Sequence, residues 1–273
     1  RYAVPGPFDE GFALYNSWRV FLGDVPGRDL WQIYGPGTPF LNAAVFWIAG
    51  VNLLTFRIAD LVVKICLLIA VALVARRAGA RFWAAWSFVL SSLVLAGLAI
   101  FGYSLVPALA FTLFSQLAWV RAADKGSIRW ALVTGALVAL AGLFRPDFGV
   151  YAFGAIGVTV ACHATLLRET IPLKMFAWMV AAAFAASLLA YAWPLSQAGV
   201  GVLWEQLIRF PLLGDLKAYT LDSPGFFRPF HAIKWWVQTS DRRNLEPLKL
   251  WTAWYPAMMA YVLGTVVALR RLH

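Results

Sequence analysis

Long apolar runs separated by short basic stretches dominate this sequence and restrict what it can fold into. Only 13% of the residues are charged, whereas soluble domains carry about a quarter. Runs of this length can cross the roughly 30 Å of hydrocarbon in a bilayer as helices. The sequence therefore predicts an all-α polytopic membrane protein and excludes a water-soluble domain. We expect spanning helices at residues 58–75, 83–101, 105–120, 130–144, 148–166, 175–193 and 251–269.

The net charge is strongly positive, at +10, and much of the surplus lies between the apolar runs. Short basic loops of this kind orient membrane helices, and they do not indicate nucleic acid as a partner. Both cysteines, Cys66 and Cys162, lie within or at the end of apolar runs, where cysteine behaves as a small hydrophobic residue. We therefore expect neither a disulfide nor a metal site from them.

The apolar run at residues 39–54 has two interpretations. It is slightly short for a span, and only Thr55-Phe56-Arg57 separates it from the next run. If it crosses the membrane, residues 1–34 lie in the cytoplasm. If it is a juxtamembrane helix, every short basic loop lies on one side, which the positive-inside rule makes cytoplasmic. We prefer this second interpretation, which places Asp9 and the segments 101–104, 145–147 and 194–250 together on the outer side.

The preferred topology divides the chain into four parts. Residues 1–57 form a first extracytoplasmic loop with juxtamembrane helices, 58–193 a transmembrane helix bundle, 194–250 a long extracytoplasmic loop, and 251–273 a further transmembrane helix. The long loop interleaves tryptophan with arginine and lysine, which suits a surface that contacts membrane lipids. Because the chain begins with Arg1 in a Pro/Gly-rich segment and ends directly after an apolar run, we expect it to be a piece of a longer protein.

An acidic pair, Asp9-Glu10, opens an amphipathic stretch near the start of the chain. By itself this pair is typical of a helix N-terminus, with Asp as the cap and Glu in the first turn. It is followed by the turn Tyr34-Gly35-Pro36-Gly37, the apolar run 39–54, and then Phe56-Arg57. This order resembles the first extracytoplasmic loop of the GT-C glycosyltransferases, which include protein O-mannosyltransferases and lipid A aminoarabinose transferases.

The resemblance implies a GT-C-like helix bundle with its active site facing the periplasm or the outside of a bacterial inner (plasma) membrane. It implies a polyprenyl-phosphate sugar donor and a glycan, lipid or protein acceptor. Asp9 is then the candidate general base, which takes the proton of the attacking hydroxyl, and Glu10 belongs to the same site. Some relatives use a divalent metal ion near this pair. No two histidines have ligand spacing, so the sequence shows no protein metal cage, and it leaves the divalent ion near the acidic pair open.

Cationic side chains could stabilise the phosphate that leaves the sugar. The resemblance suggests Arg57, Arg145 and Arg209 for this role, with Tyr34 in the same binding site. Each arginine also has a structural interpretation: Arg57 could reach lipid headgroups, Arg145 could pair with Asp147 next to Pro146, and Arg209 could face water. The functional interpretation of Arg145 makes Asp147 a catalytic candidate, because the preferred topology places it on the same side as Asp9.

Asp60 and Lys64 are ionisable residues four positions apart within a predicted span. Such residues are costly in a membrane and are often functional, but at this spacing they can also neutralise each other. We expect a structural pair, and the alternative is that Lys64 binds a phosphate.

Two other functions compete with glycosyl transfer. The first is a lipid or solute transporter in which Asp60, Lys64 and Arg145 line the path. The second is a catalytically inert membrane scaffold. The sequence contains no P-loop, dinucleotide fingerprint or Gly-x-Ser-x-Gly motif that would indicate another chemistry.

Overall fold

A computed structural model describes residues 9–32, 34–77, 86, 88, 91–92, 102–167 and 171–210 of this chain, and for residues 9, 166, 167 and 171 it describes the backbone alone. The chain divides into two compact units, Arg1–Gly214 and Asp215–His273. The second unit, with the predicted span 251–269, lies outside the described residues. So does most of the predicted span 83–101.

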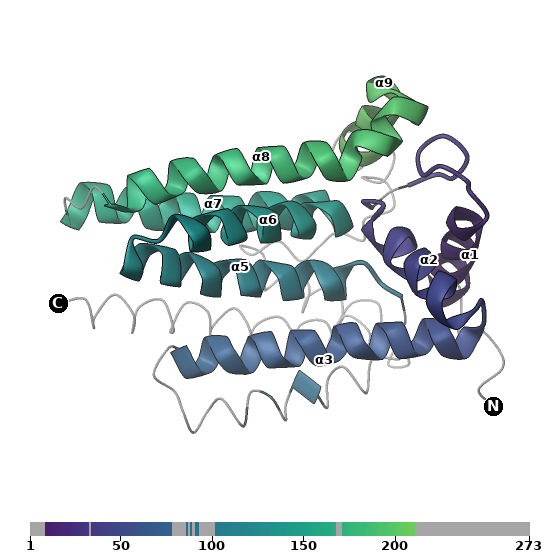
Figure 1. Cartoon of the computed structure of the whole chain (residues 1–273), viewed down its shortest axis with the longest axis horizontal. Coiled ribbons are helices and arrows are strands. Elements are labelled where there is room, and N and C mark those ends of the chain that lie inside the picture. The colour runs from purple at the N-terminus through teal and green to yellow at the C-terminus, as the bar shows by residue number, and fades with distance from the viewer. Residues whose placement is uncertain are drawn as a thin grey trace, which may run out of the picture. The chain divides into compact units, whose positions relative to one another are not determined.

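The described part of the chain is built from helices, with one isolated β-bridge between Pro26 and Leu30. Figure 1 shows their arrangement. In chain order they are α1 (Asp9–Phe21), α2 (Gly37–Ala49), α3 (Leu53–Arg77), α5 (Leu105–Lys125), α6 (Ile128–Phe144), α7 (Pro146–Cys162), the π-helix η1 (His163–Leu167), α8 (Ile171–Ala198), α9 (Val200–Trp204) and the π-helix η2 (Glu205–Arg209).

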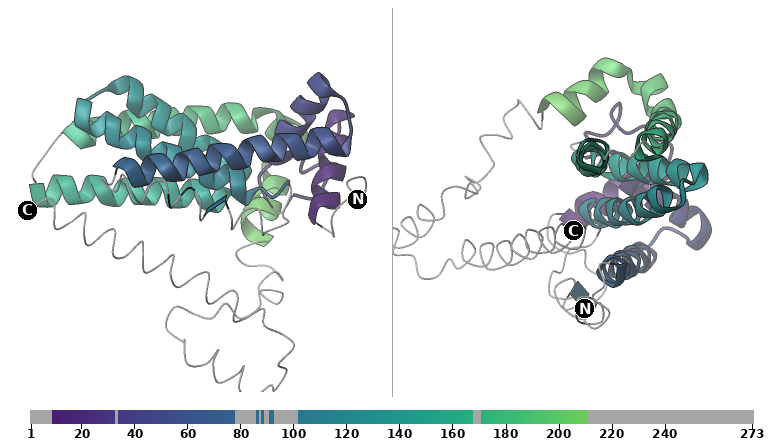
Figure 2. Two further views of the ribbon diagram at one scale, coloured as in Figure 1. Left: turned by 90° about the horizontal axis from the view of Figure 1, so that it is seen from below. Right: turned by 90° about the vertical axis from the view of Figure 1, so that its left-hand side faces the viewer.

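Five long helices, α3 and α5 to α8, run side by side, and α6 packs most extensively against α5 and α8 (Figures 1 and 2). Among the described residues, four helices are long and apolar enough to cross a membrane: Leu53–Arg77, Leu105–Lys125, Pro146–Thr165 and Pro172–Ala198. The 17 residues of α6 extend about 26 Å, so this helix is slightly shorter than the roughly 30 Å of hydrocarbon in a bilayer. These helices confirm the predicted fold class, an all-α membrane protein.

Several helix boundaries differ from the sequence prediction. α3 begins at Leu53 and not at residue 58, and α5 ends at Lys125 and not at residue 120. α8 begins at Ile171 and continues through Pro194 to Ala198. Proline removes one backbone donor, but a helix can continue past it where neighbouring groups compensate. Gly199, with φ of +80°, then separates α8 from α9. The predicted loop 194–250 is therefore largely helical over residues 194–209.

The short helices α1 and α2 pack against each other at one end of the bundle, where α3 begins and α8 ends (Figure 1). The 13 residues of α2 extend about 20 Å, which is too short to cross a bilayer. Gly50, with φ of +81°, ends α2 and separates it from α3. This geometry favours the juxtamembrane interpretation of the run 39–54 over the crossing one.

Small residues set the distance between the central helices. A Cβ atom on Gly135 of α6 would lie 2.3 Å from the carbonyl oxygen of Met179 and 2.7 Å from the Cβ of Ala182, both on α8. Met179 and Thr134 are fully buried at this contact. Backbones that approach this closely gain van der Waals contact, which is a main source of helix association in membranes.

We expect Gly135→Ala to destabilise the protein, because the added methyl group forces α6 and α8 apart. Overpacking of this kind costs about 1–3 kcal/mol. The matched control is Gly154→Ala in α7, where a Cβ would meet nothing within 4 Å. Thermal unfolding of the two purified variants in detergent should show a lower midpoint for Gly135→Ala alone. Equal midpoints would contradict the close α6–α8 contact.

Candidate functional site

Residues 102–104, which we name the 102–104 link, connect three parts of the chain at the end of the bundle that carries α1 and α2. The backbone N–H of Gly102 donates to Oδ1 of Asp60 at 2.9 Å. The hydroxyl groups of Tyr103 and Tyr34 lie 3.2 Å apart. Oγ of Ser104 lies 2.9 Å from Oγ1 of Thr38. The link therefore joins α3, the segment before α2, and the first turn of α2.

Only glycine fits at position 102 of this link. Its φ of +68° lies in the left-handed region, and a Cβ there would lie 2.3 Å from Cζ of Phe56 and 3.0 Å from Cβ of Ala13. Phe56 belongs to α3 and is fully buried, and Ala13 belongs to α1. The close approach at Gly102 thus fixes α1 against the start of α3.

Glu10 and Arg57 form a buried ion pair between α1 and α3. Nε of Arg57 donates to Oε1 of Glu10 at 2.7 Å, and Nη2 donates to Oε2 at 3.0 Å. The Glu10 side chain is 3% exposed and that of Arg57 is 19% exposed. Bidentate pairs of this kind are the strongest side-chain hydrogen bonds. The sequence analysis missed this contact, because it predicted that Arg57 would reach lipid headgroups or bind phosphate.

Asp60 and Lys64 form the structural pair that the sequence predicted. Nζ of Lys64 lies 2.8 Å from Oδ2 of Asp60, and both residues are buried within α3. The second carboxylate oxygen of Asp60 accepts the bond from Gly102. A pair that neutralises both charges lowers the cost of placing them in a membrane helix. The pair also fixes the 102–104 link.

Arg145 lies between two aromatic rings and a carboxylate. Its guanidinium donates to both oxygens of Asp147, from Nε at 3.1 Å and from Nη2 at 2.8 Å. The guanidinium carbon lies 4.9 Å from the ring centroid of Tyr34 and 5.3 Å from that of Phe148. The pairing of Arg145 with Asp147, which the sequence analysis gave as the structural interpretation, is present, and Tyr34 lies beside the same group. Through Tyr103, this cluster connects to the 102–104 link.

Arg209 has the structural role that the sequence analysis gave as its alternative. It lies in η2, donates to Glu205 at 2.9 Å, and its side chain is 62% exposed. A neighbour that the sequence analysis missed, Gln206, is buried. Its Oε1 accepts the N–H of Gln32, and its Nε2 donates to the carbonyl of Gly27, both at 2.9 Å. These bonds hold η2 against the loop between α1 and α2.

The same loop contains a carboxylate whose titration is shifted. Arg28 donates to Asp29, and the backbone N–H of Val25 also donates to Asp29 at 2.8 Å. The Arg28 hydrogen bond, followed by the Val25 hydrogen bond, lowers the pKa of Asp29. A lowered pKa means that Asp29 stabilises this loop above its ordinary pKa of about 4, and that the contribution is lost as the pH falls below that range.

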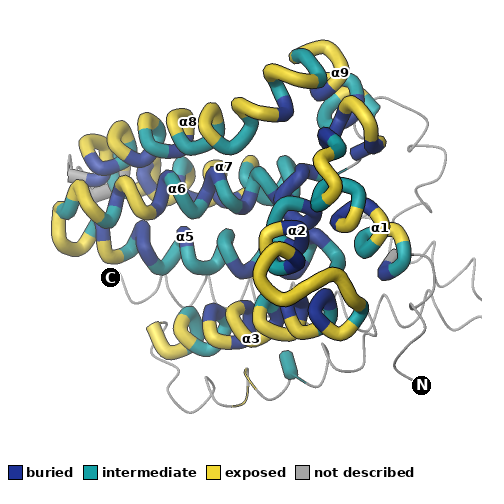
Figure 3. Tube along the Cα trace, turned by 45° about the vertical axis from the view of Figure 1, so that its right-hand side comes forward, coloured by how far each residue is buried: buried dark blue, intermediate teal, exposed yellow. Residues whose placement is uncertain are grey.

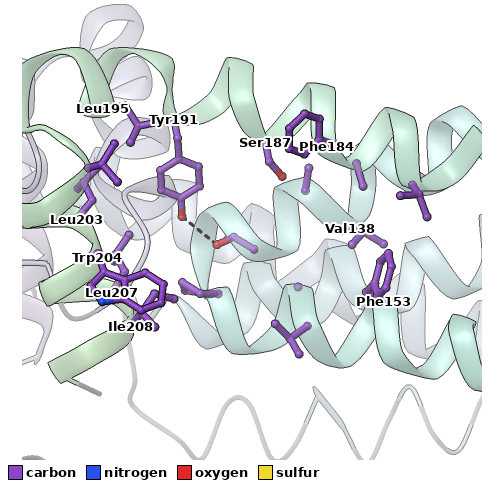
Figure 4. A pocket seen from close by; sticks show the side chains of 18 residues that line it. Val138, Phe153, Phe184, Ser187, Tyr191, Leu195, Leu203, Trp204, Leu207 and Ile208 are labelled. Atoms are coloured by element: carbon purple, nitrogen blue, oxygen red, sulfur yellow. Dashed lines mark hydrogen bonds between the residues drawn. The ribbon is translucent and has the colours of Figure 1, made fainter. Parts of the chain in front are cut away.

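An open apolar groove runs between α6, α7 and α8 and is closed at one end by α9 and η2 (Figure 4). Its volume is about 590 Å³, and its lining includes Val138, Phe153, Phe184, Leu195, Leu203 and Trp204. The hydroxyl of Tyr191 donates to the carbonyl of Gly142 at 3.2 Å within the groove.

The groove ends beside the Arg145 cluster. Pro146, which directly follows Arg145, lines the groove. Gly35, which directly follows Tyr34, packs so closely that a Cβ there would lie 3.1 Å from the Tyr191 hydroxyl and 1.9 Å from the carbonyl oxygen of Leu143. The apolar groove and the Arg145 cluster are therefore neighbours at the end of the bundle that carries α1 and α2.

Asp9 is the first residue of α1, and the structure describes its backbone alone. Asp9 and Glu10 therefore both lie in the first turn of the helix. Among the residues that the structure describes, no three His, Cys, Asp or Glu side chains gather into a metal-binding group. Both oxygens of Glu10 accept hydrogen bonds from Arg57. The divalent ion near Asp9 stays a prediction, because the side chain of Asp9 lies outside what the structure describes.

No protein-family model, curated protein or solved structure matches this chain at a significant level. The resemblance to the GT-C glycosyltransferases therefore stays a prediction that rests on the residues quoted for it.

We expect Glu10→Gln to lower the unfolding midpoint of the protein, because it removes the charge that the buried Glu10 carboxylate presents to Arg57. The matched control is Glu205→Gln, which breaks the exposed pair with Arg209 and should cost less than about 1 kcal/mol. Unfolding midpoints of the two variants in the same detergent measure the difference. Similar losses in both variants would show that burial does not govern the Glu10–Arg57 pair.

Proposed function

We propose that this protein transfers a sugar from a polyprenyl-phosphate donor to a glycan, lipid or protein acceptor at the outer face of a membrane. The observation that carries the proposal is the junction between the apolar groove and the Arg145 cluster. A donor of this class has a long apolar tail and a charged phosphate, and it needs both environments next to each other. The start of α1, with Asp9, lies at the same end of the bundle.

The groove suits the tail of the donor. It is lined almost entirely by apolar side chains of α6, α7, α8, α9 and η2, and it is open along its side. A flexible prenyl chain can enter such a groove from the surrounding lipid without leaving an apolar environment. Its phosphate would then lie at the end marked by Pro146 and Tyr191.

Arg145 is the cation best suited to the phosphate. A guanidinium carries five N–H donors, and Asp147 accepts only two of them, from Nε and Nη2. Nη1 of Arg145 donates no hydrogen bond to any group in the described ranges. The Tyr34 and Phe148 rings hold the guanidinium plane in place, so a phosphate oxygen can add to the cluster without breaking the Asp147 pair.

Like Arg145, each of the other predicted cations pairs with a carboxylate: Arg57 binds Glu10, Lys64 binds Asp60, and Arg209 binds Glu205. The Glu10–Arg57 pair joins α1 to α3, and Asp60 of the other buried pair holds the backbone of Gly102. We therefore assign Arg57 and Lys64 to holding α1 and the 102–104 link in place.

The reaction we propose is a direct displacement at the anomeric carbon of the sugar. The acceptor oxygen attacks that carbon and gives its proton to the carboxylate of Asp9. The bond between the carbon and the phosphate oxygen breaks, and its electron pair stays on the polyprenyl phosphate. Arg145 stabilises the charge that develops on this leaving group. A single displacement inverts the configuration of the sugar.

The distribution of basic residues supports the orientation of the site. Arg76, Arg77, Arg121, Lys125, Arg129 and Lys174 lie at the end of the bundle opposite to α1 and α2 (Figure 1). The positive-inside rule makes that end cytoplasmic. We accordingly propose a bacterial plasma membrane location with the candidate site on the outer face.

We expect Asp9→Asn to lower sugar transfer by a factor of about 10²–10⁴, the usual contribution of a general base. The matched control is Asp124→Asn, an exposed aspartate at the opposite end of the bundle. Cells that express each full-length variant in place of the native protein are extracted, and their polyprenyl-phosphate sugars are measured by mass spectrometry. The donor should accumulate only with Asp9→Asn. An unchanged donor pool in that variant would favour a transporter or a scaffold.

We expect Ser187→Trp to weaken donor binding, because the indole fills the groove that Ser187 lines. The matched control is Leu189→Trp on the same helix, at a residue that is 79% exposed. With a purified full-length enzyme and a long-chain donor, Ser187→Trp should raise KM with little change in the unfolding midpoint. Equal KM values for the two variants would place the prenyl chain elsewhere.

A further inference from the structure

The cations at the two ends of the bundle differ in whether they are paired. At the end that carries α1 and α2, every described arginine forms an ion pair with a carboxylate: Arg19, Arg28, Arg57, Arg145 and Arg209. At the opposite end, Arg77 pairs with Asp124. The other described cations of that end have no carboxylate partner among the described residues. We name these the unpaired cations: Arg76, Arg121, Lys125, Arg129 and Lys174.

The unpaired cations are exposed and lie where the long helices begin or end. Arg76 lies in the last turn of α3, Lys125 ends α5, Arg129 lies in the first turn of α6, and Lys174 lies near the start of α8. Figure 3 shows exposed positions at the turn between α5 and α6. An anion that binds at this end is attracted by several cations at once and meets no competing carboxylate outside the Arg77 pair.

The turn between α5 and α6 holds three of these cations on a fixed backbone. Gly126, with φ of +57°, ends α5 in a left-handed conformation. The guanidinium carbon of Arg121 lies 4.8 Å from the ring centroid of Trp130 in α6. This cation–π contact supports the guanidinium without using its N–H donors. The carboxylate of Asp124, in the same turn, is already paired with α3, so the Arg121 donors stay available to a ligand.

Apolar side chains continue from this turn along α6. Ile128, Leu132 and Val133 are 39%, 40% and 43% exposed. With Arg129 they recur at intervals of three and four residues, so one face of α6 carries a cation in its first turn and apolar side chains beyond it. A phospholipid has the same order, with a phosphate followed by acyl chains. A soluble anion would contact the cations alone and leave the apolar side chains without a partner.

We propose that the α5–α6 turn binds the headgroup of an anionic phospholipid in the leaflet at this end of the bundle. Arg121 and Arg129 present N–H donors to the phosphate oxygens, Lys125 adds a further positive charge, and the acyl chains lie along the exposed face of α6. This inference does not depend on the proposed sugar transfer, whose site lies at the other end. It also differs from the positive-inside rule, which concerns the number of basic residues and not their lack of partners.

Competitive lipid binding tests the site in the full-length protein. The delipidated protein is incubated with equal amounts of phosphatidylglycerol and phosphatidylcholine that carry the same acyl chains, and native mass spectrometry measures which lipid stays bound. A combined variant with Arg121→Gln, Lys125→Gln and Arg129→Gln removes the site. Arg209→Gln is the control, because Arg209 is exposed at the opposite end and paired with Glu205. Asp124→Asn removes the one carboxylate that the structure describes at this end.

The native protein and Arg209→Gln should retain phosphatidylglycerol several-fold over phosphatidylcholine, and the combined variant should retain the two lipids equally. Equal retention by the native protein, or an unchanged preference in the combined variant, would overturn the proposal. Asp124→Asn should raise the preference, because it leaves Arg77 unpaired. Misfolding cannot raise a preference, so the absence of this increase would overturn the proposal even if the combined variant does not fold.

An excess of glycerol phosphate distinguishes a lipid site from a site for free phosphate. It should not displace phosphatidylglycerol, because it lacks the acyl chains that contact α6. Displacement would show that the cations bind a soluble anion, and would overturn the assignment to a phospholipid.

Discussion

The close approach at Gly102 is the contact on which the outer end of the bundle depends. A Cβ at this position would overlap Phe56 and crowd Ala13, so α1, α3 and the 102–104 link can meet only around a glycine. From that point the hydrogen bonds continue outward: Gly102 to Asp60, Tyr103 to Tyr34, and Ser104 to Thr38. The position of Tyr34, and with it the setting of Arg145, follows from this contact.

Charge pairing is the second constraint on this end of the protein. Each cation that the sequence suggested for phosphate binding has a carboxylate partner, and two of the four pairs, Glu10–Arg57 and Asp60–Lys64, are largely withdrawn from water. An unpaired charge in a membrane has a high free-energy cost, and pairing with a carboxylate lowers that cost for these cations. The guanidinium of Arg145 combines aromatic support with N–H groups that Asp147 does not use, and the proposed phosphate site rests on this combination.

The outer end also differs from a soluble domain in what it exposes. α1 turns Asn16 and Ser17 inward and Phe12 and Trp18 outward. Ser17 accepts a hydrogen bond from Asn42 of α2, and Glu10 pairs with Arg57 of α3.

By itself, the sequence determined the features that depend on composition and local spacing. Apolar runs gave the spanning helices, the i,i+4 spacing gave the Asp60–Lys64 pair, and the Arg-Pro-Asp turn gave the Arg145–Asp147 pair. The tertiary structure alone decided the Glu10–Arg57 pair, whose members are 47 residues apart, the Gln206 contacts and the groove beside Arg145. These features depend on how each helix is rotated and which backbones approach closely. A hydropathy pattern sets neither property, because lipid-facing and protein-facing sides of a membrane helix are almost equally apolar.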